Sequence, residues 1–313
     1  MTVLRVAPAD ETHSASFDIV IVAVGFERRS RFAAESLRLS GRKRVAFSFT
    51  DRHVFAFGDN EAWYRESGYT VCECQDADFA AIVAGELRQL SEDGQQLSVA
   101  LDISSFNRVR IALVYDQLRR LADNGVPVTL HVVYSLAQYR PPSGKLLQNL
   151  CAGPVTPQFA GWTQDPMLPP FALVGLGYEN GKALGALDHL ELSDAIAYVP
   201  ESSESGYLPD VLQANSGLID AVGRERVVRY NVLSPVRTFE LLESTTAAIV
   251  GRHNPIILAF GPKIFFFCSL LVSTLHEQVA IWRVSAGEME PAEDRGPSGV
   301  VIRLNVDIRR DMD

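Results

Sequence analysis

The sequence contains few cysteines and none at a metal-binding spacing. The four are Cys72, Cys74, Cys151 and Cys268. Structural zinc sites repeat pairs of cysteine or histidine at short intervals, and neither the cysteines nor the six histidines do so. We therefore expect no metal site, and we expect the cysteines to be free thiols of a reducing cytoplasm.

An excess of positive charge is also absent. The net charge is -9 and the isoelectric point is near 5.2, which predicts no binding of duplex nucleic acid through overall charge. Residues 1–16 contain no apolar signal core. The one long apolar run, residues 255–275, is interrupted by Gly261, Pro262 and Lys263, so we expect no membrane span and a cytoplasmic protein.

Three common nucleotide and catalytic motifs are missing. The sequence has no Gly-x-Ser-x-Gly elbow, and Gly261-Pro-Lys263 lacks the long glycine loop of a P-loop. Gly175-Leu-Gly177 is half of a dinucleotide fingerprint, but no glycine follows at residues 178–180. We therefore predict no bound cofactor.

The chain has the length and composition of two globular domains. It contains 313 residues, of which 47% are hydrophobic and 21% are charged. Short apolar runs alternate with helical patterns, which indicates α/β structure with parallel sheets. We predict strands at residues 17–24, 44–49, 70–74, 97–103, 127–134, 171–176, 195–199, 226–232, 256–260, 279–284 and 300–306, the last antiparallel on an edge. We predict helices at residues 31–39, 61–67, 79–90, 110–122, 183–189, 207–222, 235–252 and 264–275.

An internal repeat is the most informative feature. Gly25-Phe-Glu27 follows the first predicted strand of one half, and Gly177-Tyr-Glu179 follows that of the other, at an offset of 152 residues (177 minus 25). Both halves then run through five strands in the same order of elements. We predict two duplicated Rossmann-like parallel-sheet domains in tandem, at residues 1–140 and 171–313, joined by a linker at 141–170.

The strand at residues 256–260 ends in a loop suited to anions. Pro262 fits the first turn of a helix, and Lys263 opens the longest apolar helix of the chain. The amide groups and partial positive charge of a helix N-terminus attract phosphate, and Lys263 adds a full charge. We predict a ligand here.

Ligands of open parallel sheets bind beyond the carboxyl ends of the strands, where strand order reverses. We therefore expect the loops after the first and fourth strands of each half to form the site. The predicted ligand-binding residues are Arg28, Arg29, Ser104, Ser105, Asn107, Arg108, Lys182, Gly261 and Lys263. The predicted acid or base residues are Glu27, Asp102 and Glu179.

Each of these residues also has a structural interpretation. Glu27 and Glu179 are equally expected to cap the next helix or to pair with Arg28 or Lys182, and Asp102 and Ser104 to cap a helix. Arg108 and Arg110 are alternatively solvated residues of a first helical turn.

The duplicated halves and the segment Phe260-Gly-Pro-Lys263 resemble the CARF and SAVED sensor domains of prokaryotic immunity. In CARF units a small-Gly-x-Lys loop after the fourth strand helps to hold a cyclic oligonucleotide, and SAVED is similar to two fused CARF units. The first-half loop, Asp102 to Arg108, departs from that pattern. The resemblance implies a nucleotide sensor in antiviral defence, with a protein partner that supplies the effector activity.

Three functions stay open at this point. The first is binding of a phosphate-bearing nucleotide in a cleft between the halves. The second is an enzyme that hydrolyses or transfers a nucleotide or sugar-phosphate, and the third is a scaffold subunit of a larger complex. The sequence does not decide whether the protein is an enzyme, because no Cys-His, Ser-His or metal constellation accompanies the carboxylates.

Overall fold

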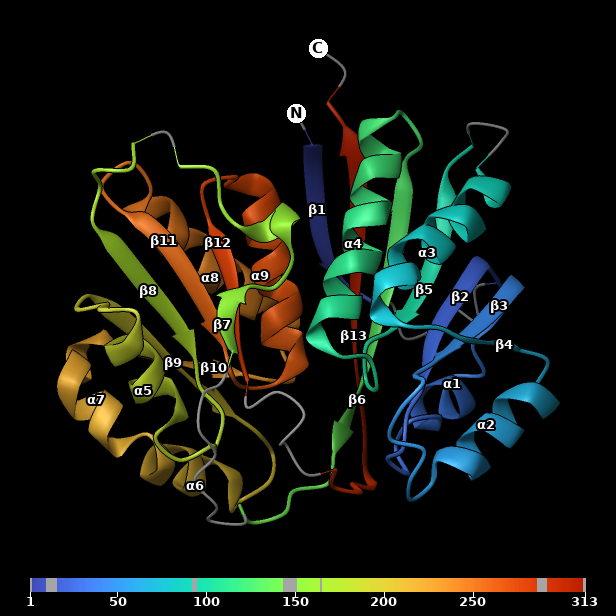
Figure 1. Cartoon of the computed structure of the whole chain (residues 1–313), viewed down its shortest axis with the longest axis horizontal. Coiled ribbons are helices and arrows are strands. Elements are labelled where there is room, and N and C mark those ends of the chain that lie inside the picture. Colours follow the sequence, from blue (N-terminus) through green and yellow to red (C-terminus); the bar gives the residue numbers. More distant parts are fainter. Residues whose placement is uncertain are drawn as a thin grey trace. The chain divides into compact units, whose positions relative to one another are not determined.

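A computed structural model of the chain describes residues 2–9, 16–91, 95–142, 151–163, 165–285 and 292–311. The chain divides into two compact units, one of Met1–Gln138 with Ala292–Asp313 and one of Tyr139–Pro291. Figure 1 shows a sheet with helices on both faces in each unit.

The first unit is built on five parallel strands. They are β2 (Ser16–Val24), β3 (Ser40–Ser48), β4 (Thr70–Glu73), β5 (Leu97–Asp102) and β6 (Val128–Ala137). Their order in the sheet is β4-β3-β2-β5-β6, which is third, second, first, fourth and fifth along the chain. β13 (Pro297–Arg310) lies antiparallel beside β6, and β1 (Thr2–Pro8) lies antiparallel beside β13 at the edge.

Two pairs of helices cover this sheet. α1 (Phe32–Ser36) and α2 (Phe57–Glu66) pack on the face that carries Val20, Val22 and Val24 of β2. α3 (Asp76–Leu90) and α4 (Arg108–Asp123) pack against one another on the opposite face. Because both faces of β2 are covered, its side chains from Ile19 to Val24 are all buried.

The second unit repeats this strand order. Its parallel strands are β8 (Pro170–Gly175), β9 (Ala195–Glu201), β10 (Val227–Asn231), β11 (Asn254–Ala259) and β12 (Ala280–Ser285). They are arranged β10-β9-β8-β11-β12, with β7 (Cys151–Pro154) antiparallel beside β12. The same third-second-first-fourth-fifth order in both units confirms the predicted pair of Rossmann-like folds.

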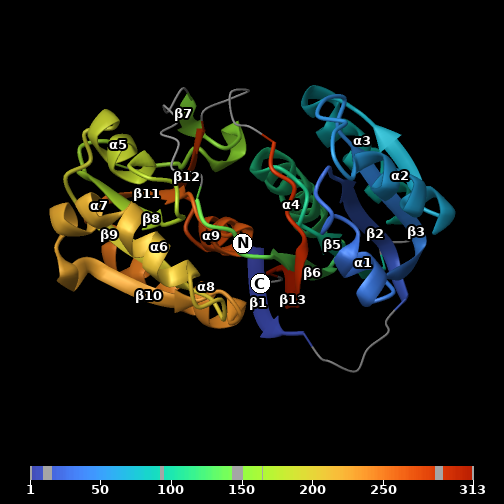
Figure 2. The same cartoon turned by 90° about the horizontal axis from the view of Figure 1, so that it is seen from below.

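The helices of the second unit are α5 (Lys182–His189), α6 (Tyr207–Ala214), α7 (Ser216–Val222), α8 (Pro235–Ile249) and α9 (Lys263–Leu275), with short 3-10 turns at η1 (Pro157–Phe159) and η2 (Arg224–Arg226). α5, α6 and α7 share a core with β8, β9 and β11, whereas α8 and α9 pack against one another. Figure 2 shows these helices from below. Every residue of α9 from Ile264 to Ser273 is buried, as the apolar run predicts.

Three features of the fold differ from the predictions. The closing strand is antiparallel but lies inside the first sheet, so the assignment of residues 171–313 to one domain is wrong at its end. The predicted linker contributes β7 to the second sheet, while its residues 143–150 and 164 lie outside the described residues. The helix predicted at 207–222 is interrupted at Asn215, which separates α6 from α7.

None of the described helices combines the length and the apolarity that a membrane crossing requires.

Candidate functional site

The strand order reverses at one place in each sheet, between the first and the fourth strand. β2 pairs with β5 in the first unit, and β8 pairs with β11 in the second. The chain leaves each pair toward opposite faces of the sheet, which opens a crevice at the carboxyl ends of the strands. The loops that follow these four strands are the candidate site of their unit.

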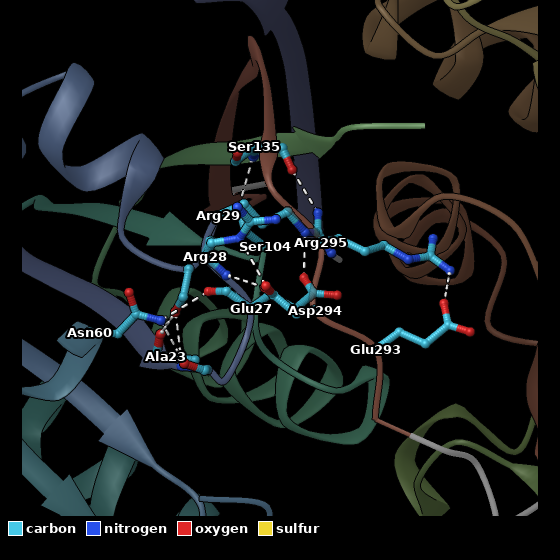
Figure 3. Close-up of polar contacts among 12 residues, drawn as sticks. Ala23, Glu27, Arg28, Arg29, Asn60, Ser104, Ser135, Glu293, Asp294 and Arg295 are labelled. Atoms are coloured by element: carbon cyan, nitrogen blue, oxygen red, sulfur yellow. Dashed lines mark hydrogen bonds and ion pairs between the residues drawn. The ribbon is translucent and has the colours of Figure 1, made fainter. Parts of the chain in front are cut away.

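The loop after β2 is fixed by hydrogen bonds from buried side chains. Ser30 Oγ accepts from the Gly25 amide at 2.8 Å, and it donates to the Ala23 carbonyl at 3.0 Å. Asn60 Nδ2 of α2 donates to the carbonyl oxygens of Gly25 at 2.8 Å and Glu27 at 2.9 Å (Figure 3). The backbone of this loop therefore has one well-determined conformation.

Tyr64 reinforces the same loop. Tyr64 donates from its hydroxyl to the Ser30 carbonyl at 2.9 Å. Burial raises the pKa of Tyr64 well above its ordinary value, and the nearby charge of Asp102 raises it further. Burial likewise raises the pKa of Tyr69 to about 12. Both phenols are therefore neutral at physiological pH, and the Tyr64 hydroxyl keeps the proton that it donates.

The second unit holds its first loop in the same way. Asn215, at the break between α6 and α7, donates from Nδ2 to the carbonyl oxygen of Gly177 at 2.7 Å and to that of Val211 at 2.8 Å. Gly25 and Gly177 are the glycines of the repeated motif, and both asparagines are nearly fully buried after the second strand of their unit. The duplication therefore includes the side chain that fixes the glycine carbonyl. Sequence reasoning missed both asparagines.

The arginines of the first loop are already paired. Arg29 is 6% exposed, forms an ion pair with Glu27, and donates from Nη1 to the Ser135 carbonyl at 2.7 Å. Arg28 donates from Nε to Asp294 at 2.8 Å and from its amide to the same carboxylate at 3.0 Å (Figure 3). Glu27 thus forms an ion pair, but with Arg29 and not with Arg28 as expected, and Arg29 is a structural residue.

The loop after β5 uses most of its predicted residues to build itself. Asp102 is buried and accepts from the Ser104 amide at 2.8 Å, while Ser104 Oγ accepts from the Ser135 amide at 2.7 Å. Asn107, and not Asp102 or Ser104, caps α4 by accepting from the Arg110 amide at 2.7 Å. These polar groups shape the loop.

Ser105 lies where the two loops of the first unit meet. A Cβ atom at Gly25 would come within 2.7 Å of Ser105 Oγ, so this close approach requires glycine. Ser105 Oγ is buried, and no hydrogen-bond partner for it occurs among the described residues. Ser105 is therefore placed at the predicted crevice.

Arg110 is a structural residue and not a solvated one. Its side chain is buried, pairs with Asp76 at 2.6 Å, and donates to the carbonyl oxygens of Ser48 at 3.0 Å and Cys74 at 2.6 Å. Its guanidinium lies over the ring of Phe49. Arg110 joins the carboxyl ends of β3 and β4 to the start of α3, a function that the sequence did not reveal.

The loop after β11 approaches β8 and the loop after it closely through backbone atoms. The Gly261 amide donates to the Gly175 carbonyl at 3.1 Å, and a Cβ atom at Gly261 would lie 2.1 Å from the Leu176 carbonyl oxygen. Gly181 has a φ of 68° and immediately precedes α5. The predicted site residue Gly261 therefore has a steric requirement for glycine.

Three of the helices that follow these loops begin with a cationic residue. Lys182 is the first residue of α5 and is only 8% exposed, and Lys263 is the first residue of α9. Arg108 is the first residue of α4, which follows the fourth strand of the first unit as α9 follows that of the second. The offset between Arg108 and Lys263 is 155 residues (263 minus 108), which equals that between Asn60 and Asn215. Glu179 is exposed in the loop after β8.

The described residues contain no cluster of three or more His, Cys, Asp or Glu side chains that could hold a metal ion.

Comparisons with known proteins add little. No family model and no curated protein sequence matches the chain. Among solved structures, it is similar to a leucoanthocyanidin reductase from Vitis vinifera in complex with NADPH, with 11% identity, 88% of this chain and 95% of that chain covered, and a TM-score of 0.24. It is also similar to the cytoplasmic domain of a prokaryotic cation chloride cotransporter, with 11% identity, coverage of 88% and 97%, and a TM-score of 0.25. At such TM-scores neither similarity supports an argument about function.

Proposed function

We propose that the protein binds a phosphate-bearing nucleotide at the carboxyl edges of its parallel sheets. One observation carries the proposal: in the second unit, Gly261 of the loop after β11 lies against the end of β8 and Leu176 of the loop after it, and each loop leads into a helix whose first residue is lysine. The N-termini of α5 and α9, with the ammonium groups of Lys182 and Lys263, thus follow the two neighbouring strands, β8 and β11, between which the strand order reverses. That combination suits a phosphate group.

The first unit supports the same proposal less strongly. Arg108 occupies the position of Lys263, and the loop after β2 is fixed as the loop after β8 is fixed. Arg28 and Arg29, however, are paired with Asp294 and Glu27. We assign the main phosphate contact to Lys263 and Lys182 because they are the first residues of the two helices at the switch point, with Arg108, the first residue of α4, as the equivalent contact of the first unit.

The geometry favours binding over catalysis. Of the three predicted acid or base residues, Glu27 is held by Arg29, and Asp102 is buried and accepts from the Ser104 amide. Glu179 is exposed, but no metal cluster or histidine pair among the described residues accompanies it. A general acid or base requires a poised proton close to the substrate, and two of the three carboxylates already have structural partners.

The resemblance to CARF and SAVED domains supports a finer proposal. In this proposal the nucleotide is a cyclic oligonucleotide, the chain is a sensor of a prokaryotic defence system, and a protein partner carries the effector activity. That both halves share one ligand stays a prediction from the sequence.

Mass spectrometry of the small molecules that copurify with the protein tests the proposal. A nucleotide that is retained intact is the expected result. A nucleotide that is converted on incubation, but not by a Glu179→Gln variant, would favour the enzyme. The absence of any nucleotide, with no thermal shift by mononucleotides or cyclic oligonucleotides, would favour the scaffold.

A further inference from the structure

The aromatic residue of each repeated motif packs against a second aromatic residue from the segment after the next strand. Phe26 and Phe55 have ring centroids 6.2 Å apart, and Tyr178 and Tyr207 have centroids 5.7 Å apart. The offsets are identical, because 178 minus 26 and 207 minus 55 both give 152 residues. The duplication has therefore placed an aromatic pair at the carboxyl edge of both sheets. Each pair lies next to the loop that contains Gly25 in the first unit or Gly177 in the second.

The segment that carries Phe55 combines exposed apolar side chains with left-handed backbone conformations. Phe55 is 61% exposed although its side chain is large and apolar, and Val54 beside it is exposed as well. Arg52 and Phe55 have φ angles of 59° and 51°, in the left-handed region that residues other than glycine rarely adopt. Such strained backbone is concentrated at functional sites.

The backbone on both sides of Phe55 is nevertheless held by its neighbours. The Ala56 amide donates to the carbonyl oxygen of Phe26 at 3.1 Å, which ties the loop after β3 to the loop after β2. His53 stacks on Phe57 at 4.0 Å with an interplanar angle of 12° and contacts the Phe49 carbonyl at 2.6 Å. A rigid, exposed aromatic face loses little conformational freedom when a planar ligand stacks on it.

The second unit surrounds its pair with polar groups. Tyr139 and Tyr178 both stand edge-on to Tyr207, at interplanar angles of 85° and 90°. The hydroxyl of Tyr139 donates to Asp210, and this hydrogen bond raises the pKa of Tyr139 to about 12. The cluster thus offers one carboxylate and three half-buried phenol rings beside Gly177.

We propose that the aromatic pairs Phe26–Phe55 and Tyr178–Tyr207 are nucleobase platforms, one in each unit. The inference rests on the proposed function, in which the phosphate lies at the loops after the first and fourth strands. In each sheet the first strand has the fourth strand on one side and the second strand on the other: β5-β2-β3 in the first unit and β11-β8-β9 in the second. A nucleotide whose phosphate contacts the switch-point loops therefore directs its base along the sheet edge toward the loop after the second strand. Any nucleobase can stack on an aromatic ring, so these platforms would favour ligands that carry a base without selecting one base over another.

The test compares probes that do and do not carry a base. The probes are the four nucleoside 5′-diphosphates and inorganic pyrophosphate, titrated calorimetrically into the wild-type protein, the double variant Phe55→Ala/Tyr207→Ala, which removes one ring of each platform, and a control, Met167→Ala, which removes an exposed apolar side chain before β8. The double variant should bind the tightest diphosphate roughly ten- to hundred-fold more weakly and pyrophosphate unchanged. The control should match the wild type with both.

A tryptophan at the same place gives a direct signal. Phe55→Trp should retain nucleotide binding, and its added fluorescence should be quenched by a nucleoside diphosphate but not by pyrophosphate. Equal affinity of the double variant and the wild type for the nucleoside diphosphate would overturn both platforms, and an absence of quenching in Phe55→Trp would overturn the platform of the first unit. Neither result would contradict the proposed function. If no nucleoside diphosphate and no pyrophosphate binds the wild type, both proposals fall together.

Discussion

The side-chain amide of Asn60 donates to the Gly25 carbonyl at 2.8 Å, and the amide of Asn215 donates to the Gly177 carbonyl at 2.7 Å. Each asparagine follows the second strand of its unit, and each glycine follows the first. The same contact in two units of similar topology is the clearest structural trace of the duplication.

Removing either amide should destabilise the chain. Asn60→Ala leaves the carbonyls of Gly25 and Glu27 without this donor in a buried setting, which costs about 1–3 kcal/mol for each group. Urea denaturation should show a lower midpoint for Asn60→Ala and for Asn215→Ala. The exposed Asn180→Ala is the control and should change the free energy of unfolding by less than about 0.5 kcal/mol. A midpoint for Asn60→Ala equal to that of the control would show that the contact does not hold the loop.

Two glycine substitutions should have opposite effects. A Cβ at Gly261 would lie 2.1 Å from the Leu176 carbonyl oxygen, whereas one at Gly85, inside α3, meets nothing within 4 Å. Gly261→Ala should cost about 1–3 kcal/mol by overpacking, and Gly85→Ala should stabilise by roughly 0.5–1 kcal/mol through helix propensity. Thermal unfolding of both variants measures the difference. A Gly261→Ala protein as stable as the wild type would contradict the close approach of the two loops.

Neighbouring arginines should differ sharply in their effect on stability. Arg29 is buried with Glu27, and its replacement by methionine leaves that carboxylate without its partner, at a cost of about 3–5 kcal/mol. The side chain of Arg28 is 55% exposed, so Arg28→Met should cost less than about 1 kcal/mol. Chemical denaturation of the two variants, which change charge identically, provides the comparison. Equal losses would refute the structural role of Arg29.

Alkaline pH should unfold the protein through its buried phenols. Burial raises the pKa of Tyr198 from 10.0 to about 12, so the unfolded chain loses this proton first. The resulting stability is complete below pH 10 and is lost as the pH rises toward 12, by about 2–3 kcal/mol for this group. Tyr198→Phe should therefore show a flatter decline in the free energy of unfolding across this range. An unchanged slope would show that Tyr198 is not protected in the folded state.

The sequence predicts the sheet elements well, because strands buried on both faces are continuous apolar runs. The runs at β2, β5, β8 and β11 have this form and lie within a residue or two of their predicted limits. Two strands were not placed correctly from the sequence: β13 was assigned to the other sheet, and β1 was not predicted. β13 joins β6 of the first unit, and nothing in its local pattern specifies the sheet to which it belongs. β1 has seven residues, none of them fully buried, and it was not predicted as a strand.

Only part of the candidate site was predicted, because only part of it leaves a local signal in the sequence. The helices that begin at Arg108 and Lys263 were predicted to begin only one or two residues later, at 110 and 264, since helix starts leave local signals. The contact between Arg28 and Asp294 spans 266 residues, and that between Asn60 and Gly25 spans 35. Such contacts follow from the assembled sheet and not from local spacing. The matching offsets of Asn60 with Asn215 and Arg108 with Lys263 were the signal that was available in the sequence.

Calorimetric titration of the Lys263→Glu variant tests nucleotide binding at these loops most directly. The control is Arg237→Glu on α8, where an 80% exposed arginine receives the same charge change. The tightest nucleotide found for the wild type should bind the Lys263 variant roughly 10- to 150-fold more weakly, because a charge-assisted contact of about 1.5–3 kcal/mol is lost, and should bind the control unchanged. Equal affinity of the Lys263 variant and the wild type, with the fold intact by circular dichroism, would contradict the assignment of the nucleotide to these loops.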